Sequence, residues 1–212
     1  MLGADDGIVS VASILIGVAA ANGSAHAVLI AGIAGLVAGA LSMAAGEYVS
    51  VSSQRDTELA DIDLERRELE QAPGAELKEL IDIYVHRGLD EELATKVAQR
   101  LMEVDPVGAH IRDELGFTES GMARPWQAAV ASAISFAVGA ALPIVAVVFA
   151  PSRWRIPVVA VVGLVLLAIL GAVGGRIGGA PMGRAALRVT VGGGVAMALT
   201  AGIGRLVGAA GL

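Results

Sequence analysis

The chain has 212 residues, 55% of them hydrophobic, and a mean hydropathy of +0.71. Soluble globular domains are less apolar than this, so the composition indicates a membrane protein with several spans. The absence of cysteine from the sequence excludes disulfides, thiolate metal sites and cysteine nucleophiles.

The formal charge of −6 is distributed unevenly along the chain. Of the 21 acidic residues, 18 lie between Asp56 and Glu119, whereas the interval 53–124 holds nine of the 15 Lys and Arg residues. Its formal charge is therefore −9, and apolar sequence flanks it on both sides. This pattern predicts two transmembrane helices over 1–52, an acidic helical domain over 53–124, and three more transmembrane helices over 125–212.

Five apolar runs approach the roughly 20 residues that a helix needs to cross a bilayer. They cover about 2–21, 27–51, 126–150, 156–174 and 185–207. Small residues four positions apart recur in these runs and allow helices to approach closely, as at Gly204 and Gly208. We therefore expect an all-α polytopic membrane protein with a helical insert between its second and third spans.

Two carboxylates and one thioether stand out in the first two runs. Asp6 lies near the start of the first run, Glu47 lies near the end of the second, and Met43 precedes Glu47 by one helical turn. A carboxylate within a bilayer costs roughly 2.5–3.5 kcal/mol, so those that persist usually face a pathway or a partner. A thioether is a soft ligand for late first-row metals. These residues predict a releasable metal site, with core or lipid packing as the alternative for Met43 and an interfacial cap as the role of Asp5.

The acidic insert is expected to consist of four short helices. The first covers 57–71, the second 75–88 and the third 90–104, while the fourth begins at Asp105-Pro106. Gly88 is the predicted C-terminal cap of the second helix, and Asp90 and Asp105 are the predicted N-caps of the next two.

The insert contains three pairs of potential metal ligands at helical spacing. Residues three or four positions apart share one face of a helix, and the pairs are Glu65 and Glu68, Glu76 and Glu79, and His110 and Glu114. Their oxygens suit Fe²⁺, Mn²⁺, Mg²⁺ or Ca²⁺, and the imidazole favours transition metals. The alternative is a solvated acidic bundle that binds no metal.

Lys and Arg residues indicate the orientation of the chain. Placing the insert in the cytoplasm also places the Arg176–Arg188 connection there, which collects 12 of the 15 basic residues inside. Arg153, Arg155 and Arg205 then remain on the outer side. We expect a cytoplasmic N-terminus and an external C-terminus.

The stretches DDGIVSVASILIGVAAA and AGIAGLVAGALSMAAGEYVSVSSQRD resemble the vacuolar iron transporter family, and the resemblance covers almost the whole chain. That family includes plant and yeast vacuolar iron and manganese importers and nodulin-21-like proteins. The resemblance implies a homodimer with five spans per chain that moves Fe²⁺ or Mn²⁺ out of the cytoplasm in exchange for protons. In a bacterial cell the same polarity would place the protein in the cell membrane.

The resemblance also implies site residues. The family's membrane ligands fall on Asp6 and Met43, and its insert glutamates fall on Glu65, Glu68, Glu76, Glu79 and Glu114. His110 stands where the family has a metal-binding methionine, and Glu47 is present although Gly35 replaces a membrane glutamate of plant members.

We therefore expect an exporter of Fe²⁺, and of Mn²⁺ as a second cargo, with Co²⁺ and Zn²⁺ as further candidates. The alternative is a membrane-anchored metal sensor or buffer that does not transport. No Ser/His/Asp set, zinc-protease helix or phosphate loop occurs in the sequence, so we expect no enzyme. We also expect no prosthetic group and no nucleic-acid partner.

Overall fold

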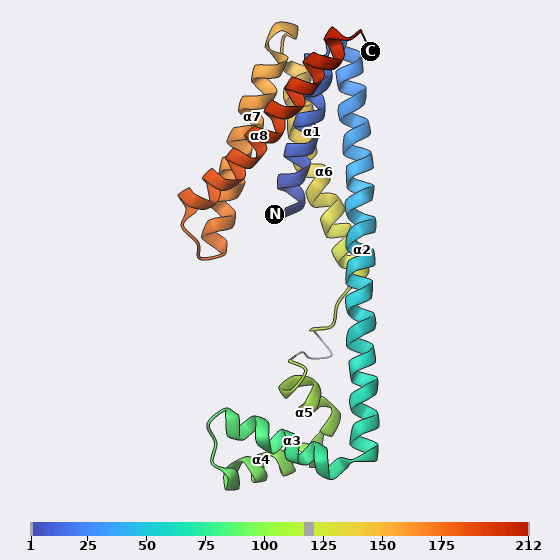
Figure 1. Ribbon diagram of the computed structural model, residues 1–212, viewed down its shortest axis with the longest axis vertical. Helices are drawn as coiled ribbons and strands as arrows, with labels where there is room; N and C mark the ends of the chain where they lie inside the picture. The colour runs from blue at the N-terminus through green and yellow to red at the C-terminus, as the bar shows by residue number, and fades with distance from the viewer. Residues whose placement is uncertain (1, 117–120, 212) are drawn as a thin grey trace. The chain divides into compact units, whose positions relative to one another are not determined.

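The structure is a computed structural model that describes residues 2–116 and 121–211, and all the regular elements in these ranges are helices (Figure 1). Five helices are long and apolar enough to cross a membrane, which confirms the five predicted spans. In chain order the elements are α1 (Leu2–Ala20), α2 (Ala25–Gln71), α3 (Pro73–His86), α4 (Glu91–Val104), α5 (Pro106–Asp113), α6 (Pro125–Phe149), the 3₁₀ turn η2 (Ser152–Trp154), α7 (Arg155–Ile177) and α8 (Met182–Ala209).

The second span and the first insert helix form one continuous helix, α2, of 47 residues. The sequence suggested two helices, over 27–51 and 57–71, because polarity changes sharply between them. The separation was wrong, because no proline or glycine lies between Val51 and Gln71 to interrupt the backbone hydrogen bonds. The helix ends before Pro73, whose ring disfavours helical backbone at the residue before it.

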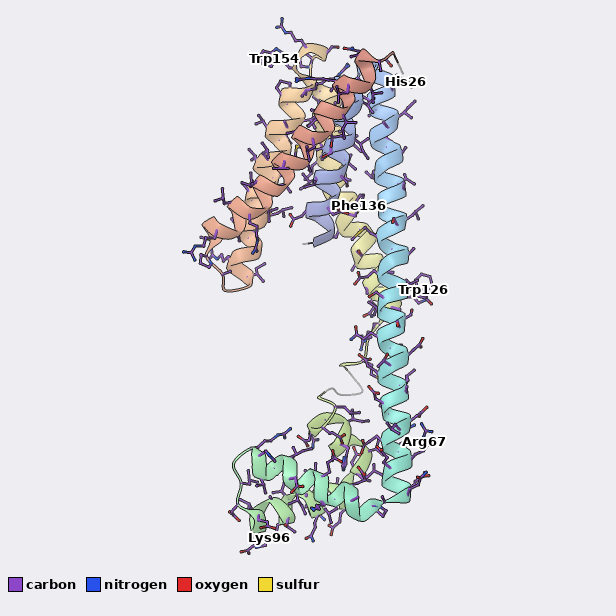
Figure 2. All side chains as sticks on the ribbon, in the orientation of Figure 1. His26, Arg67, Lys96, Trp126, Phe136 and Trp154 are labelled. Carbon is purple, nitrogen blue, oxygen red and sulfur yellow. The ribbon has the colours of Figure 1, made fainter. Side chains whose placement is uncertain are left out.

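The chain divides into two compact units. The membrane unit comprises Met1–Glu47 and Trp126–Leu212, and the insert unit comprises Tyr48–Pro125. In the membrane unit, α1 contributes more buried core residues than any other helix, and Phe136 of α6 packs into the same core (Figure 2). The core residues of α1 are Ile8, Val11, Ala12, Leu15 and Ile16.

Glycines let the helices of the membrane unit approach at backbone distance. A Cβ at Gly204 of α8 would meet the carbonyl of Gly17 of α1, and one at Gly208 would meet the backbone of Ala21. Close approach increases van der Waals contact, which drives helix association where lipid removes the hydrophobic contribution. The Gly204 and Gly208 pair noted in the sequence therefore forms a helix contact.

We expect Gly204→Leu to destabilise the membrane unit by about 1–3 kcal/mol, because its side chain must displace backbone atoms of α1. The control is Gly202→Leu on the same helix, since a Cβ at Gly202 meets nothing within 4 Å. Thermal unfolding in detergent should show a lower melting temperature for Gly204→Leu alone. Equal losses in both variants would contradict the close contact.

The predicted caps of the insert unit are confirmed. The Asp90 side chain accepts a hydrogen bond from the Leu93 N–H at 2.9 Å, and Asp105 accepts one from the Gly108 N–H at 3.0 Å. Gly88 follows α3 with a φ of +100°, the left-handed conformation that glycine adopts without strain. These caps set the turns between α3, α4 and α5, which pack around buried Leu80, Ala98 and Ala109.

Candidate metal centre

Three helices of the insert unit direct metal-ligating side chains to one point. Glu65 comes from α2, Glu76 from the first turn of α3, and His110 from α5. Glu114 is the residue that ends α5. Because Pro73 begins α3 directly after α2 ends, and Asp105 caps the start of α5, local turn chemistry positions all three helices.

The four side chains form a compact cluster. One ligand atom from each lies within 4.8 Å of all the others. The Nδ1 atom of His110 lies 2.9 Å from a carboxylate oxygen of Glu65, 3.1 Å from one of Glu114 and 3.8 Å from one of Glu76. Transition metals hold nitrogen and oxygen ligands at about 2.0–2.2 Å, so ligands on opposite sides of an ion lie up to about 4.4 Å apart. Small side-chain movements would therefore close this set around an ion.

Three of the four side chains are buried, Glu114 is exposed, and the polar atoms of the cluster are incompletely paired. The exposed fraction is 0% for His110, 2% for Glu65 and 7% for Glu76. The Nε2 atom of His110 is buried without a hydrogen-bond partner, and Glu65 and Glu114 share the single Nδ1 atom of the ring. One imidazole cannot neutralise three carboxylates at this distance, and buried like charges repel strongly. A divalent cation would satisfy all three, which makes the cluster a candidate metal centre.

Protonation of Glu65 reflects this environment. The pKa of Glu65 is raised from 4.5 to about 7, mainly by burial and next by the charge of Glu114, and His110 opposes the rise. The charges of Glu76 and Glu68 raise it further. A metal that binds below this pH must displace the proton, so metal binding and proton release are linked at the centre.

We expect the affinity of the full-length protein for Mn²⁺ to rise about fivefold from pH 6 to pH 7, since one proton leaves Glu65 per ion bound. Well above its pKa Glu65 is fully ionised, so the affinity should level off there. Titration calorimetry in buffers of different ionisation enthalpy measures both the affinity and the number of protons released. An affinity that stays flat between pH 6 and pH 7 would contradict the assignment of a proton to Glu65.

Glu68 and Glu79 lie outside the four-residue cluster, on the exposed surface beside it. The charge of Glu68 acts on Glu65, and the pKa of Glu79 is raised first by burial and then by Glu114 and Glu76. The structure therefore brings four of the six predicted insert ligands together and places two carboxylates nearby, where they can attract cations from solution.

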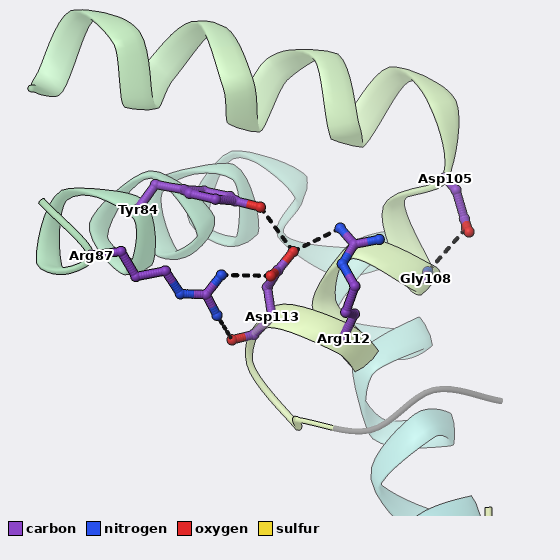
Figure 3. A network of polar contacts seen from close by, with 6 residues as sticks. All are labelled: Tyr84, Arg87, Asp105, Gly108, Arg112 and Asp113. Atoms are coloured by element: carbon purple, nitrogen blue, oxygen red, sulfur yellow. Dashed lines mark hydrogen bonds and ion pairs between the residues drawn. The ribbon is translucent and has the colours of Figure 1, made fainter. Parts of the chain in front are cut away.

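A polar network holds the last turn of α5 against α3 (Figure 3). Arg87 donates to the Asp113 carboxylate at 2.6 Å and to the Asp113 backbone carbonyl at 2.8 Å, and Tyr84 donates to the carboxylate at 3.0 Å. Arg112 donates to the same carboxylate at 2.8 Å. Burial raises the pKa of Asp113, but these hydrogen bonds outweigh burial and hold it below its usual value. The network fixes the end of α5 and thereby the position of Glu114, the residue that follows.

We expect Asp113→Ala to destabilise the α3–α5 contact by about 1–3 kcal/mol, because it removes a 7% exposed carboxylate and leaves Tyr84 and Arg87 without their acceptor. Amide hydrogen exchange of the full-length protein in detergent should show faster exchange in both helices. Glu92→Ala is the control, since its ion pair with Lys96 is exposed and contributes little. Exchange in Asp113→Ala that matches wild type would contradict the anchoring role.

The three predicted membrane ligands occupy α1 and α2 of the membrane unit. Asp6 is exposed, Glu47 is half-buried, and Met43 is half-buried against the hydrophobic core. The neighbouring Asp5 lies in the first turn of α1, and one of its carboxylate oxygens is buried without a partner. The structure thus positions these residues individually, whereas the insert ligands share one cluster.

Sequence reasoning missed the network around Asp113. Tyr84 and Arg87 lie 29 and 26 residues before it, so no helical spacing could reveal the contact. The neighbouring Glu114 drew attention because it is four residues from His110.

Comparison with known proteins finds similarity over almost the whole chain. The sequence model of the VIT family matches residues 1–205. A vacuolar iron transporter of Acanthamoeba castellanii is 48% identical over 207 residues, which cover 97% of this chain and 76% of that protein. Vacuolar iron transporter homolog 5 of Oryza sativa subsp. japonica is 39% identical over all of this chain and 80% of its own length. Vacuolar iron transporter homolog 2.1 of Arabidopsis thaliana is 36% identical over 99% of this chain and 80% of its own length.

Proposed function

The chain belongs to the VIT family of vacuolar iron transporters, and from this premise we propose that it exports Fe²⁺ from the cytoplasm in exchange for protons. Its five candidate membrane helices and its membership of this family indicate that the protein transports metal. The proposal adds a direction, a coupling ion and a route to that function. Mn²⁺ is proposed as a second cargo because the same ligands suit it.

The observation that carries the proposal is the cluster of Glu65, Glu76, His110 and Glu114. Three carboxylates and one imidazole suit Fe²⁺ and Mn²⁺ better than Mg²⁺ or Ca²⁺, which prefer oxygen ligands alone. In the proposed mechanism the exposed carboxylates of Glu68 and Glu79 attract the ion, and the buried cluster binds it. The ion then passes to Glu47, Met43 and Asp6 in the membrane unit.

Proton exchange is proposed because carboxylates exchange protons for metal. A metal ion and a proton each neutralise the charge of a carboxylate. A carboxylate that loses a metal ion in a weakly polar site therefore gains a proton readily. A metal ion that leaves Asp6 for the far side of the membrane would therefore be replaced by a proton. Asp6 then releases this proton to the cytoplasm and is ionised again, ready for the next metal ion.

The proposed orientation places the insert unit and the N-terminus in the cytoplasm and the C-terminus on the other side. The relatives are named for the vacuole, an internal membrane, and the cell membrane is the equivalent barrier in a cell without vacuoles. In either membrane the metal leaves the cytoplasm. A homodimer is proposed as the transporting unit, so that α1 and α2 of two copies border one path.

Proteoliposomes test the proposal. Vesicles that carry the full-length protein and an acidic lumen should accumulate Fe²⁺ against its gradient, and a protonophore should abolish the accumulation. Protease cleavage of the insert identifies the vesicles in which it faces outward. An absence of Fe²⁺ movement in either direction would contradict transport and favour a membrane-anchored sensor or buffer, in which metal binding by the insert is the whole function.

A further inference from the structure

A second concave site lies at one end of the membrane unit. Three segments of the chain line a cavity of about 440 Å³: the end of α1 with the α1–α2 connection, the start of α7 with the turn before it, and α8. Its polar lining residues are Asn22, Ser152, Arg153, Arg155 and Arg205. We name this site the arginine pocket.

The arginine pocket is strongly cationic. Three guanidinium groups line it, and no carboxylate does so among the described residues around it. The sequence contains no acidic residue after Glu119, and Asp5 and Asp6 lie in the first turns of α1, whereas Ala19 at its last turn lines the pocket. At a rise of about 1.5 Å per residue, Asp6 lies about 20 Å along the helix from Ala19, too far to pair with the guanidinium groups of the pocket.

The start of α7 adds to the positive potential. Arg155 is the first residue of this helix, and its N-cap residue Trp154 makes no side-chain hydrogen bond to the first turn. The helix dipole places partial positive charge at this end of α7. Two arginines at such an end repel this charge, so a bound anion would stabilise both the guanidinium groups and the helix terminus.

The aromatic residues beside the pocket indicate its depth. Trp154 is 51% exposed in the turn before α7 (Figure 2). Phe149, the last residue of α6, is 81% exposed. Tryptophan in a membrane protein is enriched at the level of the lipid headgroups. The pocket therefore lies where phosphate groups of phospholipids are concentrated, and a guanidinium fork matches the oxygens of a phosphate in a bidentate manner.

We propose that the arginine pocket binds a phosphate group, with an anionic phospholipid as its source. The three arginines hold the phosphate oxygens, the positive end of the α7 dipole faces the same charge, and the acyl chains remain in the bilayer. This site is independent of the metal centre, since it shares no residue with the proposed metal ligands.

The test measures lipid retention by the full-length protein. Protein in detergent is titrated with dioleoyl phosphatidylglycerol or dioleoyl phosphatidylcholine and analysed by native mass spectrometry. We expect tighter retention of phosphatidylglycerol, weakened on the order of a hundredfold in the triple variant Arg153→Gln, Arg155→Gln, Arg205→Gln. The matched control is Arg176→Gln, Arg184→Gln, Arg188→Gln, which removes three arginines around the α7–α8 connection and should leave retention unchanged.

Two further measurements distinguish the outcomes. Inorganic phosphate at millimolar concentration that raises the melting temperature of wild type, but not of the pocket variant, supports the phosphate site with free phosphate as its source. If the triple pocket variant fails to fold, Arg205→Gln and Arg205→Lys are compared instead. Loss of phosphatidylglycerol retention in Arg205→Gln, with retention preserved in Arg205→Lys, supports a charge-dependent site. Equal retention of both lipids with no effect of phosphate, or equal losses in both triple variants, would overturn the proposal.

Discussion

Replacing His110 with alanine should lower the affinity of the full-length protein for Mn²⁺ or Co²⁺ by about a hundredfold or more. Loss of a residue that merely orients a ligand already weakens metal binding by roughly 10–100-fold, and His110 touches all three carboxylates of the cluster. Without the imidazole, the carboxylates of Glu65, Glu76 and Glu114 also repel one another, so protons would occupy part of the site.

The matched control is His86→Ala. His86 is an exposed histidine at the end of α3, and it interacts with the Asp82 carbonyl of its own helix. Titration calorimetry with Mn²⁺, which resists oxidation, compares both variants with wild type. Equal affinity losses in His86→Ala and His110→Ala would place the metal elsewhere.

Replacing Asp6 with asparagine should abolish Fe²⁺ transport in proteoliposomes while the insert binds metal as before. The change keeps the size of the side chain and removes the charge that a cation would need within the bilayer. Asp5→Asn is the comparison, since it makes the same chemical change one residue earlier, at a carboxylate predicted from the sequence to be an interfacial cap. Transport by Asp6→Asn at the wild-type rate would exclude Asp6 from the ion path.

Met43 requires a variant that separates ligation from packing. Its side chain packs against the hydrophobic core, so alanine would leave a cavity there. Met43→Leu nearly conserves the volume and removes the sulfur. We expect this variant to fold normally and to lose transport of Fe²⁺, the proposed cargo, because the thioether ligand is missing. Normal transport by Met43→Leu would assign Met43 a packing role alone.

The sequence predicted local features well because short-range chemistry determines them. Asp90, Asp105 and Gly88 act within a few residues of their own position, so the local sequence was enough to identify these caps. The five spans follow from the lengths of apolar runs. Helical spacing likewise paired His110 with Glu114.

Long-range features could not be read in this way. The approach of His110 to Glu65 joins residues 45 positions apart, and spacing within a helix cannot show which helices converge. For the same reason the six insert candidates could not be sorted into four clustered residues and the exposed Glu68 and Glu79. The continuity of α2 was missed because a change of polarity was interpreted as a break, although a change of side-chain polarity does not interrupt the backbone hydrogen bonds of a helix.

The burial of α1 has a consequence for biogenesis. Ile8, Val11, Ala12, Leu15 and Ile16 contact neighbours that are mostly synthesised later, since α6, α7 and α8 follow more than 100 residues downstream. The nascent α1 therefore enters the bilayer before the helices that cover it exist, and it is less apolar than α6 or α7. We expect it to insert as a hairpin with α2, which follows after four residues and offers the translocon a more hydrophobic segment.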